Sequence, residues 1–334
     1  MKAQQLGVAI AGVAALTLGW SASAPALAAD QTVTIRMSHT LPATDPVGLG
    51  AERFKEIVEK MTNGTVKVAI FPNNQLGGEN QALQQEKQGS IQMAVTGAGT
   101  VGNLVPDISV LDAPYIWKDW EAEKKVLSGP VFKHFQQELE GTQGLKLLSA
   151  TWFYGRRNLT CNKLIRKPED AAGLKIRTPP SPVNLLSAEV LGGKGTPMDF
   201  PQVYLALKTG TIDCEENPLP TILSGKLYEV QKYVMMTHHI QQSQVVTMNL
   251  AFWEGLNPDQ QKAVQTAADE AGAYETGLGL KAEETDLKKM QGMKETQVVT
   301  DIDLPAFVAR ARELDPRMKT VWGGLYDQII AEQR

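Results

Sequence analysis

The sequence predicts an α/β protein of two lobes, with a cleft between them and a long helix that spans both. Three observations support this fold class. After residue 30 the chain alternates strand and helix patterns, which is typical of a sheet with parallel crossovers. The same alternation starts again near residue 145 and is followed by one long helical pattern. The length of 334 residues also exceeds what a single core usually holds.

The first unit begins with a strand that buries one face. Val33, Ile35 and Met37 alternate with polar residues, as expected of such a strand. Apolar residues then recur at intervals of three and four over 47–61, which predicts an amphipathic helix that ends near Gly64. Further patterns predict a strand at 66–70, a helix at 80–88 that ends at Gly89, and a strand at 91–95.

The second unit repeats the alternation. Strands are expected at 145–153, 157–161, 174–177 and 211–213, and helices at 183–191 and 204–209. Asn257 and Pro258 are helix start signals and predict a long helix over 260–289 that runs across both units. A last helix is expected over 304–333. Since no low-complexity linker separates the units, the chain should cross between them more than once. The cleft between such units is the usual place for a ligand.

Composition excludes several classes of protein. Hydrophobic residues make up 43 % of the chain and charged residues 21 %, values that are ordinary for a soluble globular protein. The net charge of −4 and the isoelectric point near 5.7 argue against a nucleic-acid partner, because phosphate binding needs clustered Lys and Arg. Two cysteines exclude a disulfide scaffold or a structural zinc site but allow one bridge.

Residues 1–28 have the layout of a secretory signal peptide. Lys2 supplies a positive charge, residues 6–20 are apolar, and Ala26-Leu27-Ala28 fits the small-x-small cleavage pattern. The apolar run is shorter than the roughly 20 residues of a membrane span, and no later stretch is long and apolar enough to cross a bilayer. The mature protein is therefore expected to be soluble and outside the cytoplasm; an uncleaved anchor is the alternative.

One glycine-rich segment matches a cofactor motif only weakly. Residues 97–102 read G-x-G-x-x-G after a strand, but Pro106 interrupts the helix that a dinucleotide site requires. A turn that lines the cleft is the preferred interpretation, and no cofactor is expected.

Signals for catalysis are also weak. His238 and His239 are adjacent, so they point to different faces and make a poor metal pair. Glu215 and Glu216 diverge for the same reason, which favours one solvated and one structural carboxylate over an acid–base pair. The mature chain contains neither a G-x-S-x-G elbow nor an H-E-x-x-H helix. No metal site or catalytic residue is expected.

Each of the two cysteines is expected at the end of a strand. In an oxidising compartment Cys161 and Cys214 are slightly more consistent with a disulfide than with two buried thiols.

The most informative residues lie between 152 and 218. Aromatic residues precede Arg156 and Arg157, and Arg177 ends an apolar strand beside two prolines. Guanidinium groups present a rigid fork of donors that suits a carboxylate, and strand ends in α/β lobes face the cleft.

These residues resemble the solute receptors of tripartite ATP-independent periplasmic (TRAP) transporters, the family of the C4-dicarboxylate and sialic acid receptors. The family pattern reads roughly G-x-R, P-x-D-x-x-G-x-K-x-R, T-P-M-x-F and D-G-x-E-N-P. The chain shows Gly155 to Arg157, Pro168 to Arg177, Thr196 to Phe200 and Asp213 to Pro218. It departs from the pattern at Cys214, where the family usually has Gly; this supports pairing with Cys161.

The resemblance implies roles for particular residues. Arg177 corresponds to the arginine that forms the salt bridge to the ligand carboxylate, and Arg157 to a second arginine near it. Asn217 corresponds to the asparagine that also holds this carboxylate, and Phe200 to an aromatic wall of the pocket. His39 and residues 96–98 are expected near the far end of the ligand.

The resemblance also implies a periplasmic binding protein fold and a receptor without enzymatic activity. Residues 29–154 and 243–282 are expected to form the first lobe, and 155–242 and 283–334 the second. The lobes would close on a small organic acid and deliver it to the membrane permease of a TRAP transporter.

Aromatic residues favour a particular class of ligand. Trp152, Phe153 and Phe200 are placed to face a sugar ring, which favours a sugar acid such as a uronate. A C4-dicarboxylate is the alternative ligand, and an exported enzyme acting on an organic acid in the cleft is the alternative class.

The cleavage pattern at residues 26–28 predicts a mature N-terminus at Ala29. The intact mass of the protein released by osmotic shock should equal that of residues 29–334. A mass that retains Lys2 and the apolar run would instead identify the segment as an anchor.

Overall fold

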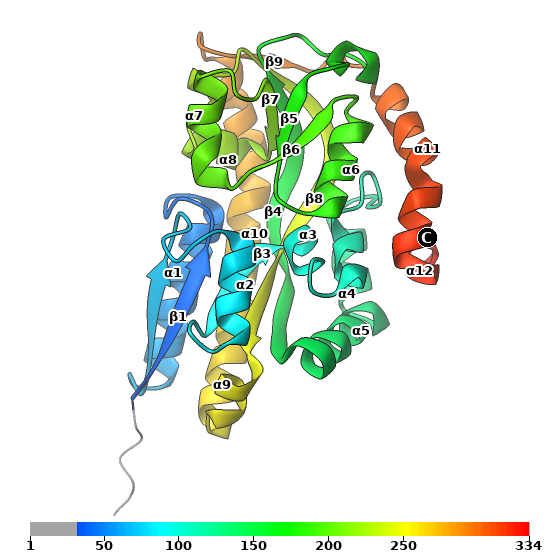
Figure 1. Ribbon diagram of the computed structural model, residues 1–334. Helices are drawn as coiled ribbons and strands as arrows, with labels where there is room; N and C mark the ends of the chain where they lie inside the picture. The colour runs from blue at the N-terminus through cyan, green and yellow to red at the C-terminus, as the bar shows by residue number, and fades with distance from the viewer. Residues whose placement is uncertain (1–31, 334) are drawn as a thin grey trace, which may run out of the picture. The chain divides into compact units, whose positions relative to one another are not determined.

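A mixed nine-stranded sheet organises residues 32–333, the part of the chain that the computed structural model describes (Figure 1). Its strands follow the order β2-β1-β3-β8-β4-β7-β5-β6, and β9 pairs with β8. Pairing is parallel within the β2-β1-β3 group and the β7-β5-β6 group, and antiparallel between them. The α/β class is confirmed, with parallel pairing in the two end groups and between β8 and β9. The signal peptide expected at residues 1–28 lies outside the described residues.

The first end group has the predicted strand–helix alternation. It comprises β1 (Val33–His39), α1 (Pro46–Met61), β2 (Val66–Phe71), α2 (Glu79–Lys87) and β3 (Met93–Gly97). Helix α1 begins where the Asp45 side chain accepts a hydrogen bond from Val47 N and where proline occupies the first turn. Its apolar face packs into a core with the strands.

The second end group follows the same scheme. It comprises β5 (Lys175–Thr178), α6 (Pro182–Val190), β6 (Lys194–Pro197), α7 (Val203–Lys208), β7 (Cys214–Asn217) and α8 (Leu219–Ser224). Strand β7 lies three residues later than predicted. Residues 214–217 are all buried and include Glu215 and Glu216. Because charged residues usually indicate an exposed segment, the sequence pattern does not predict a buried strand here.

Two long antiparallel strands join the end groups. β4 (Leu145–Cys161) and β8 (Tyr233–Asn249) pair along most of their lengths, with several register shifts. The two strands predicted at 145–153 and 157–161 are thus one continuous strand. The residues between them form an irregularity in the β4–β8 pairing but do not end the strand. Gly155 has φ +127° there, a conformation that residues with a Cβ rarely adopt.

Helix α10 (Pro258–Gln291) confirms the long helix predicted from its start signals. Asn257 and Gln260 form a capping box at its beginning. The helix packs against α1 and β4 and also reaches α8 and β9, so it contacts both end groups. Figure 1 shows it running behind the sheet past both groups.

Shorter elements complete the described chain. They are α3 (Ala98–Val101), η1 (Pro106–Asp112), α4 (Trp120–Leu127), α5 (Pro130–Glu138), η2 (Leu139–Gln143), η3 (Pro168–Ala171), η4 (Phe200–Gln202), η5 (Leu227–Glu229), α9 (Leu250–Gly255), β9 (Gln297–Val299), α11 (Leu304–Trp322) and α12 (Gly324–Glu332). The single helix predicted over 304–333 is divided in two, because Gly323 takes a positive φ of 52°. None of the helices within 32–333 has the length and apolarity that a membrane crossing requires.

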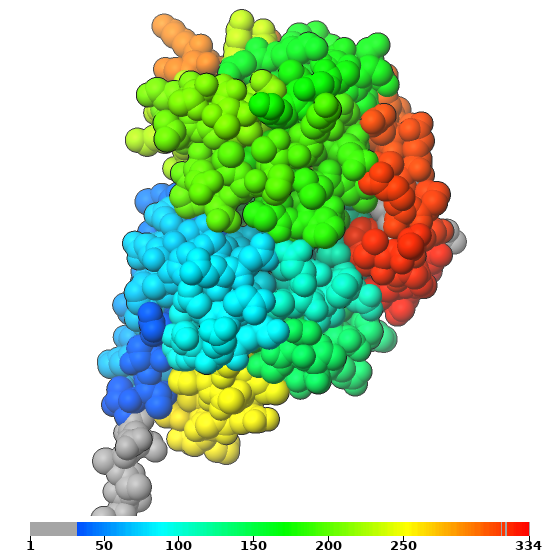
Figure 2. All heavy atoms as spheres, viewed as in Figure 1, coloured from blue at the N-terminus to red at the C-terminus, as the bar shows by residue number. Residues whose placement is uncertain are grey.

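The end groups meet closely. In Figure 2 the blue-to-cyan surface and the green surface adjoin along a narrow seam, without a wide opening on this face. Helix α12 returns to the first group, where Gln333 Nε2 donates to the carbonyl of Ile116 at 3.0 Å.

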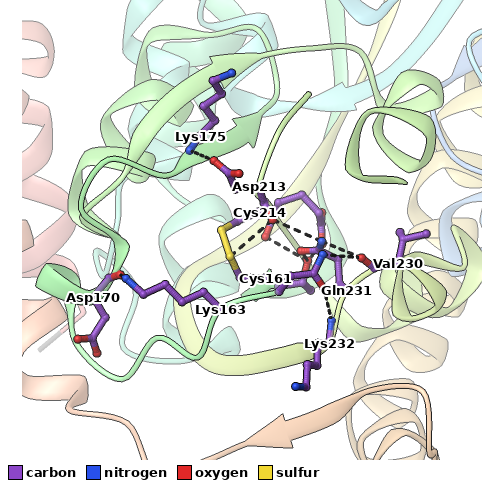
Figure 3. Close-up of a disulfide and its surroundings, with 12 residues drawn as sticks. Cys161, Lys163, Asp170, Lys175, Asp213, Cys214, Val230, Gln231 and Lys232 are labelled. Atoms are coloured by element: carbon purple, nitrogen blue, oxygen red, sulfur yellow. Dashed lines mark hydrogen bonds between the residues drawn. A yellow bond between two sulfur atoms is a disulfide. The ribbon is translucent and has the colours of Figure 1, made fainter. Parts of the chain in front are cut away.

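A disulfide joins Cys161 at the end of β4 to Cys214 at the start of β7, with an S–S distance of 2.04 Å. The two residues lie directly opposite each other in the β4–β7 pair and are buried. Figure 3 shows the surrounding hydrogen bonds, including the one from Lys175 N to the Asp213 carboxylate at 2.8 Å. The bridge therefore ties the end of the crossing strand β4 to β7 of the second end group.

Glu86 on α2 and Glu123 on α4 carry buried carboxyl groups. Glu86 accepts hydrogen bonds from Ala94 N at 3.1 Å and from Thr247 Oγ1 at 2.8 Å, and Glu123 accepts one from Gln241 Nε2 at 2.7 Å. Burial raises the pKa of each carboxyl to about 8, although these hydrogen bonds lower it. Both groups are therefore largely protonated in the folded protein at neutral pH.

Replacing Cys161 and Cys214 together by Ser should lower the free energy of unfolding by about 2–4 kcal/mol, because the unfolded chain loses a constraint. Chemical denaturation measures this loss. Ligand affinity should stay within about threefold, since the bridge does not line the cavity described below. Thiol titration of the denatured, unreduced wild type should find no free thiol; two per chain would contradict the bridge.

Stability should rise as the pH falls from about 8 towards 5. The unfolded chain releases the protons of Glu86 and Glu123 near their ordinary pKa of 4.5, whereas the folded protein keeps them up to about pH 8. Stabilisation by each group is complete below the unfolded pKa and is lost as the pH rises, by up to about 1.4 kcal/mol per pH unit. Denaturation between pH 5 and 8 measures this slope.

The variant Glu86→Gln should have a shallower slope, whereas the exposed control Glu121→Gln should leave it unchanged. Equal slopes for Glu86→Gln and the wild type would show that Glu86 does not titrate in this way.

Candidate functional site

A cavity lies where the two end groups meet, with an empty volume of about 560 Å³. The first group contributes the end of β1, the loop before α2, α2 itself and the β3–α3 junction. The second contributes the loops after β5 and β6, and the end of β7. Residues of the crossing strands β4 and β8 form its floor. This position, between two groups of one sheet, is typical of a small-molecule site.

Arg177 is the cation of this cavity that has no acidic partner. It lies on β5, is 3 % exposed, and donates from Nε to the carbonyl of Met198 at 2.8 Å. Among residues 32–333, no carboxylate lies within 4.0 Å of its guanidinium, and its two Nη atoms make no hydrogen bond. Burial and the nearby Arg157 lower the pKa of Arg177 from its ordinary value. A buried cation in this state requires an anionic ligand or water.

Arg157 on β4 is compensated by the protein itself. Its guanidinium forms a buried ion pair with Glu216, and Nη1 donates to Gln242 Oε1 at 2.7 Å. His239 Nε2 lies 3.0 Å from the same Glu216 carboxylate. Although burial raises the pKa of Glu216, Arg157 and His239 outweigh it and lower this pKa to about 2. Arg157 is therefore held rigidly, with its charge balanced.

Asn217 and Glu215 form the neighbouring polar group. Asn217 accepts a hydrogen bond from the Tyr154 hydroxyl at 3.0 Å and donates to Glu215 at 2.5 Å. Glu215 also accepts from Thr160 Oγ1 at 2.8 Å. The expectation that one of Glu215 and Glu216 is solvated is wrong, because both are fully buried and hydrogen-bonded. They do point to different partners, as expected of adjacent strand residues.

The opposite end of the cavity carries hydrogen-bonding groups that lack partners. His39 at the end of β1 is 2 % exposed, and neither ring nitrogen has a hydrogen bond. Asn74 Nδ2 and Asn184 Oδ1 are also buried without partners. Burial lowers the pKa of His39 to about 4, so the ring is neutral at neutral pH. A neutral imidazole offers one donor and one acceptor to a ligand.

Two acidic residues also line the cavity. Glu79 accepts a hydrogen bond from Thr100 Oγ1 at 2.7 Å, and Asp199 also lines the cavity. Glu79, Asn74 and Asn184 were not identified from the sequence, because no spacing links a loop, the first turn of α2 and the first turn of α6.

The structure brings most of the predicted residues together. Arg177, Arg157, Asn217, Phe200 and His39 all line the cavity, and the Arg177 guanidinium carbon lies 5.8 Å from the centre of the Phe200 ring.

Trp152 is the exception and requires a correction. Its indole is fully buried against α10, where Nε1 donates to the carbonyl of Ala268 at 2.9 Å. A Cβ at Gly272 would lie 2.5 Å from this ring, so the helix approaches the indole through a glycine. Phe153 is likewise buried, with its ring centre 5.0 Å from that of Trp120. Both residues belong to the core and do not face the cavity.

The glycine motif serves close packing. Gly97 ends β3 and lines the cavity, and Gly99 N donates to Asp112 Oδ2 at 2.8 Å. A Cβ at Gly99 would lie within 2.7 Å of Asn184 Nδ2 and 2.8 Å of Ser181 Oγ. The expected turn is a short helix whose glycine lets the two end groups meet.

Comparisons with known proteins agree with this arrangement. Residues 37–319 match the family model of bacterial extracellular solute-binding protein, family 7. The chain is 36 % identical to the 2,3-diketo-L-gulonate-binding periplasmic protein YiaO of Escherichia coli, over 89 % of this chain and 88 % of that protein. It is also 36 % identical to the C4-dicarboxylate-binding periplasmic protein DctP of Rhodobacter capsulatus, over 86 % and 84 %.

A solved structure shares the fold. The TRAP periplasmic solute-binding protein of Actinobacillus succinogenes with bound L-galactonate superposes with a TM-score of 0.85 at 30 % identity, covering 90 % of this chain and 99 % of that one. These matches extend over nearly all of the described residues, and the sheet order and the cavity agree with them. The chain is a member of bacterial extracellular solute-binding protein family 7, the TRAP receptor family to which its motifs pointed.

Proposed function

We propose that this protein captures a small organic acid in the periplasm and delivers it to the membrane permease of a TRAP transporter. The observation that carries the proposal is the buried Arg177 guanidinium without an acidic partner. A ligand carboxylate would supply the missing charge through two parallel hydrogen bonds. Arg157, whose charge Glu216 balances, and Asn217 would hold the second face of that carboxylate.

Capture involves closure of two lobes in this proposal. Residues 29–154 and 243–282 form the first lobe, and residues 155–242 and 283–334 the second, except that α12 packs on the first lobe. The crossing strands β4 and β8 connect them. Opening would expose Arg177 to water, and a bound acid would shift the population towards the closed form.

The far end of the cavity favours a polyhydroxylated acid over a C4-dicarboxylate. A second carboxylate would meet Glu79 and Asp199, and the neutral His39 would not balance its charge. Hydroxyl groups would instead satisfy the His39 ring, Asn74 Nδ2 and Asn184 Oδ1, which lack partners. Relatives named for 2,3-diketo-L-gulonate and crystallised with L-galactonate support a sugar acid, whereas DctP keeps the dicarboxylate as the alternative.

Binding proceeds without turnover in this proposal. A thermal-shift screen of sugar acids, uronates and C4-dicarboxylates identifies the ligand, since an acid at about 100 times its Kd adds about 2.7 kcal/mol to stability. The bound acid should be recovered unchanged after release. Conversion of any acid in the panel would favour the exported enzyme.

Arg177→Ala should weaken binding of the best acid by about 10²–10⁴-fold, because the ligand carboxylate would be buried without its cation. Arg177→Lys should recover part of the loss, since the charge survives but the fork does not. Isothermal titration of the three proteins measures both effects.

The control is Arg166→Ala, which removes an exposed arginine paired with Asp301 and should leave Kd unchanged. If Arg177→Ala binds within about threefold of wild type, the carboxylate site lies elsewhere.

A further inference from the structure

A buried carboxylate outside the cavity connects the two lobes. Asp45, in the β1–α1 loop of the first lobe, is 1 % exposed. Its Oδ1 accepts from Val47 N at 3.1 Å, within its own lobe. Its Oδ2 accepts from Thr221 Oγ1 and from Ser224 Oγ, both at 3.0 Å, and these two residues belong to α8 of the second lobe. None of Asp45, Thr221 and Ser224 lines the cavity.

The position of α8 ties this contact to the binding site. The helix begins at Leu219, two residues after Asn217, which lines the cavity. On the other lobe, Val47 follows Asp45 closely and lines the same cavity. The two sides of the contact therefore move with two walls of the cavity when the lobes separate.

Two interlobe hydrogen bonds at the edge of the seam are of a different kind. Asn80 Nδ2 and Asn103 Nδ2 donate to the carbonyl of Pro180 at 3.1 and 3.0 Å, at the edge of the seam. Neutral bonds of this sort are exchanged for water at little net cost. Asp45 is a buried acid, and buried charges are expensive to leave without partners.

Electrostatics support this distinction. Burial raises the pKa of the Asp45 carboxyl to about 6, while the hydrogen bonds from Val47, Thr221 and Ser224 lower it. At neutral pH the group is thus mostly ionised, and two of the three bonds that stabilise its charge come from the opposite lobe. Separation of the two lobes would expose the Asp45 carboxylate to water.

We infer that Asp45, Thr221 and Ser224 form an interlobe latch that sets ligand affinity without touching the ligand. The inference rests on the proposed closure of the two lobes. The latch bonds exist only in the closed form, so they act on the open–closed equilibrium and on the rate of ligand release. They contribute nothing to the stability of the open, ligand-free protein.

The test uses Thr221→Val with Ser224→Ala, and the same pair with Asp45→Asn added. The pair removes both donors and leaves a buried carboxylate without interlobe partners. Adding Asp45→Asn removes the charge and keeps the cap of α1, because Asn is as good an N-cap as Asp. Ser187→Ala is the matched control: this buried hydroxyl of the second lobe bonds to Val183 O of its own helix.

The measurement is the closed fraction, read by single-molecule energy transfer between dyes on cysteines introduced at the exposed Lys67 and Lys208, one in each lobe. L-galactonate is titrated from zero upwards. The pair should shift the closing midpoint about 10–100-fold to higher concentration and speed release, with an unchanged association rate. Adding Asp45→Asn should reverse most of this shift and bring the midpoint back towards the wild-type value. Ser187→Ala should leave the midpoint unchanged. Ligand-free melting temperatures should agree throughout.

Superimposed titration curves, or a triple variant no better than the pair, would overturn the latch. If L-galactonate closes none of the proteins, that choice of acid fails, and the ligand-free closed fractions decide the latch alone. A lower fraction in the pair that Asp45→Asn restores supports the latch, and equal fractions, zero included, overturn it.

Discussion

Two guanidinium groups are buried in one cavity, and the protein supplies a carboxylate for only one of them. Glu216 balances Arg157, whereas Arg177 has only a carbonyl oxygen as its partner among the described residues. Taking a cation out of water costs several kcal/mol unless an opposite charge or hydrogen bonds replace the lost solvation. In the closed arrangement Arg177 thus forms no ion pair, and in our proposal a bound acid supplies one. Charge balance links binding to closure in our proposal.

The sheet topology places the two arginines in different parts of the molecule. Arg157 and its partners lie on β4, β7 and β8, inside the pairing of the crossing strands, so the compensated arginine is fixed to the rigid centre. Arg177 lies on β5, one group further out, while His39 and Glu79 come from the first group. The cavity therefore takes its charged and hydrogen-bonding groups from both sides of the crossing. Neither side forms the whole site by itself.

Much of the fold could be predicted from the sequence because periodicity reports burial. Helix α10 and the strands of the first group follow their apolar patterns and start signals. Prediction failed at β7, where Glu215 and Glu216 are buried only because Arg157, His239, Thr160 and Asn217 receive them. Arg157 and Thr160 lie on β4 and His239 on β8, while Asn217 is two residues along β7 from Glu215. No local pattern reveals such compensation, so a charged pair appears exposed until the sheet is assembled.

Some residues of the candidate site could likewise be predicted from the sequence, and others could not. Arg177 and Asn217 could be placed because they occur in recognisable motifs at strand ends. Trp152 was misplaced because alternation assigns a side chain to a face but does not say what covers that face, and here α10 covers it. Glu79, Asn74 and Asn184 belong to elements of the two lobes that meet only in three dimensions. Their chemistry could not be anticipated, since each is an ordinary polar residue in its own segment.

Selectivity then depends on the part of the site that the sequence revealed least. Arg177 offers the same fork to any carboxylate, so it distinguishes acids from neutral solutes and not one acid from another. A ligand without hydroxyl groups would leave the His39 ring, Asn74 Nδ2 and Asn184 Oδ1 buried and unpaired, at about 1–3 kcal/mol for each lost partner. A site built to bond a hydroxyl rejects analogues that lack it far more strongly than an apolar pocket rejects a missing methylene. In the proposed receptor, charge therefore decides whether an acid is held, and unpaired hydrogen-bonding groups decide which acid it is.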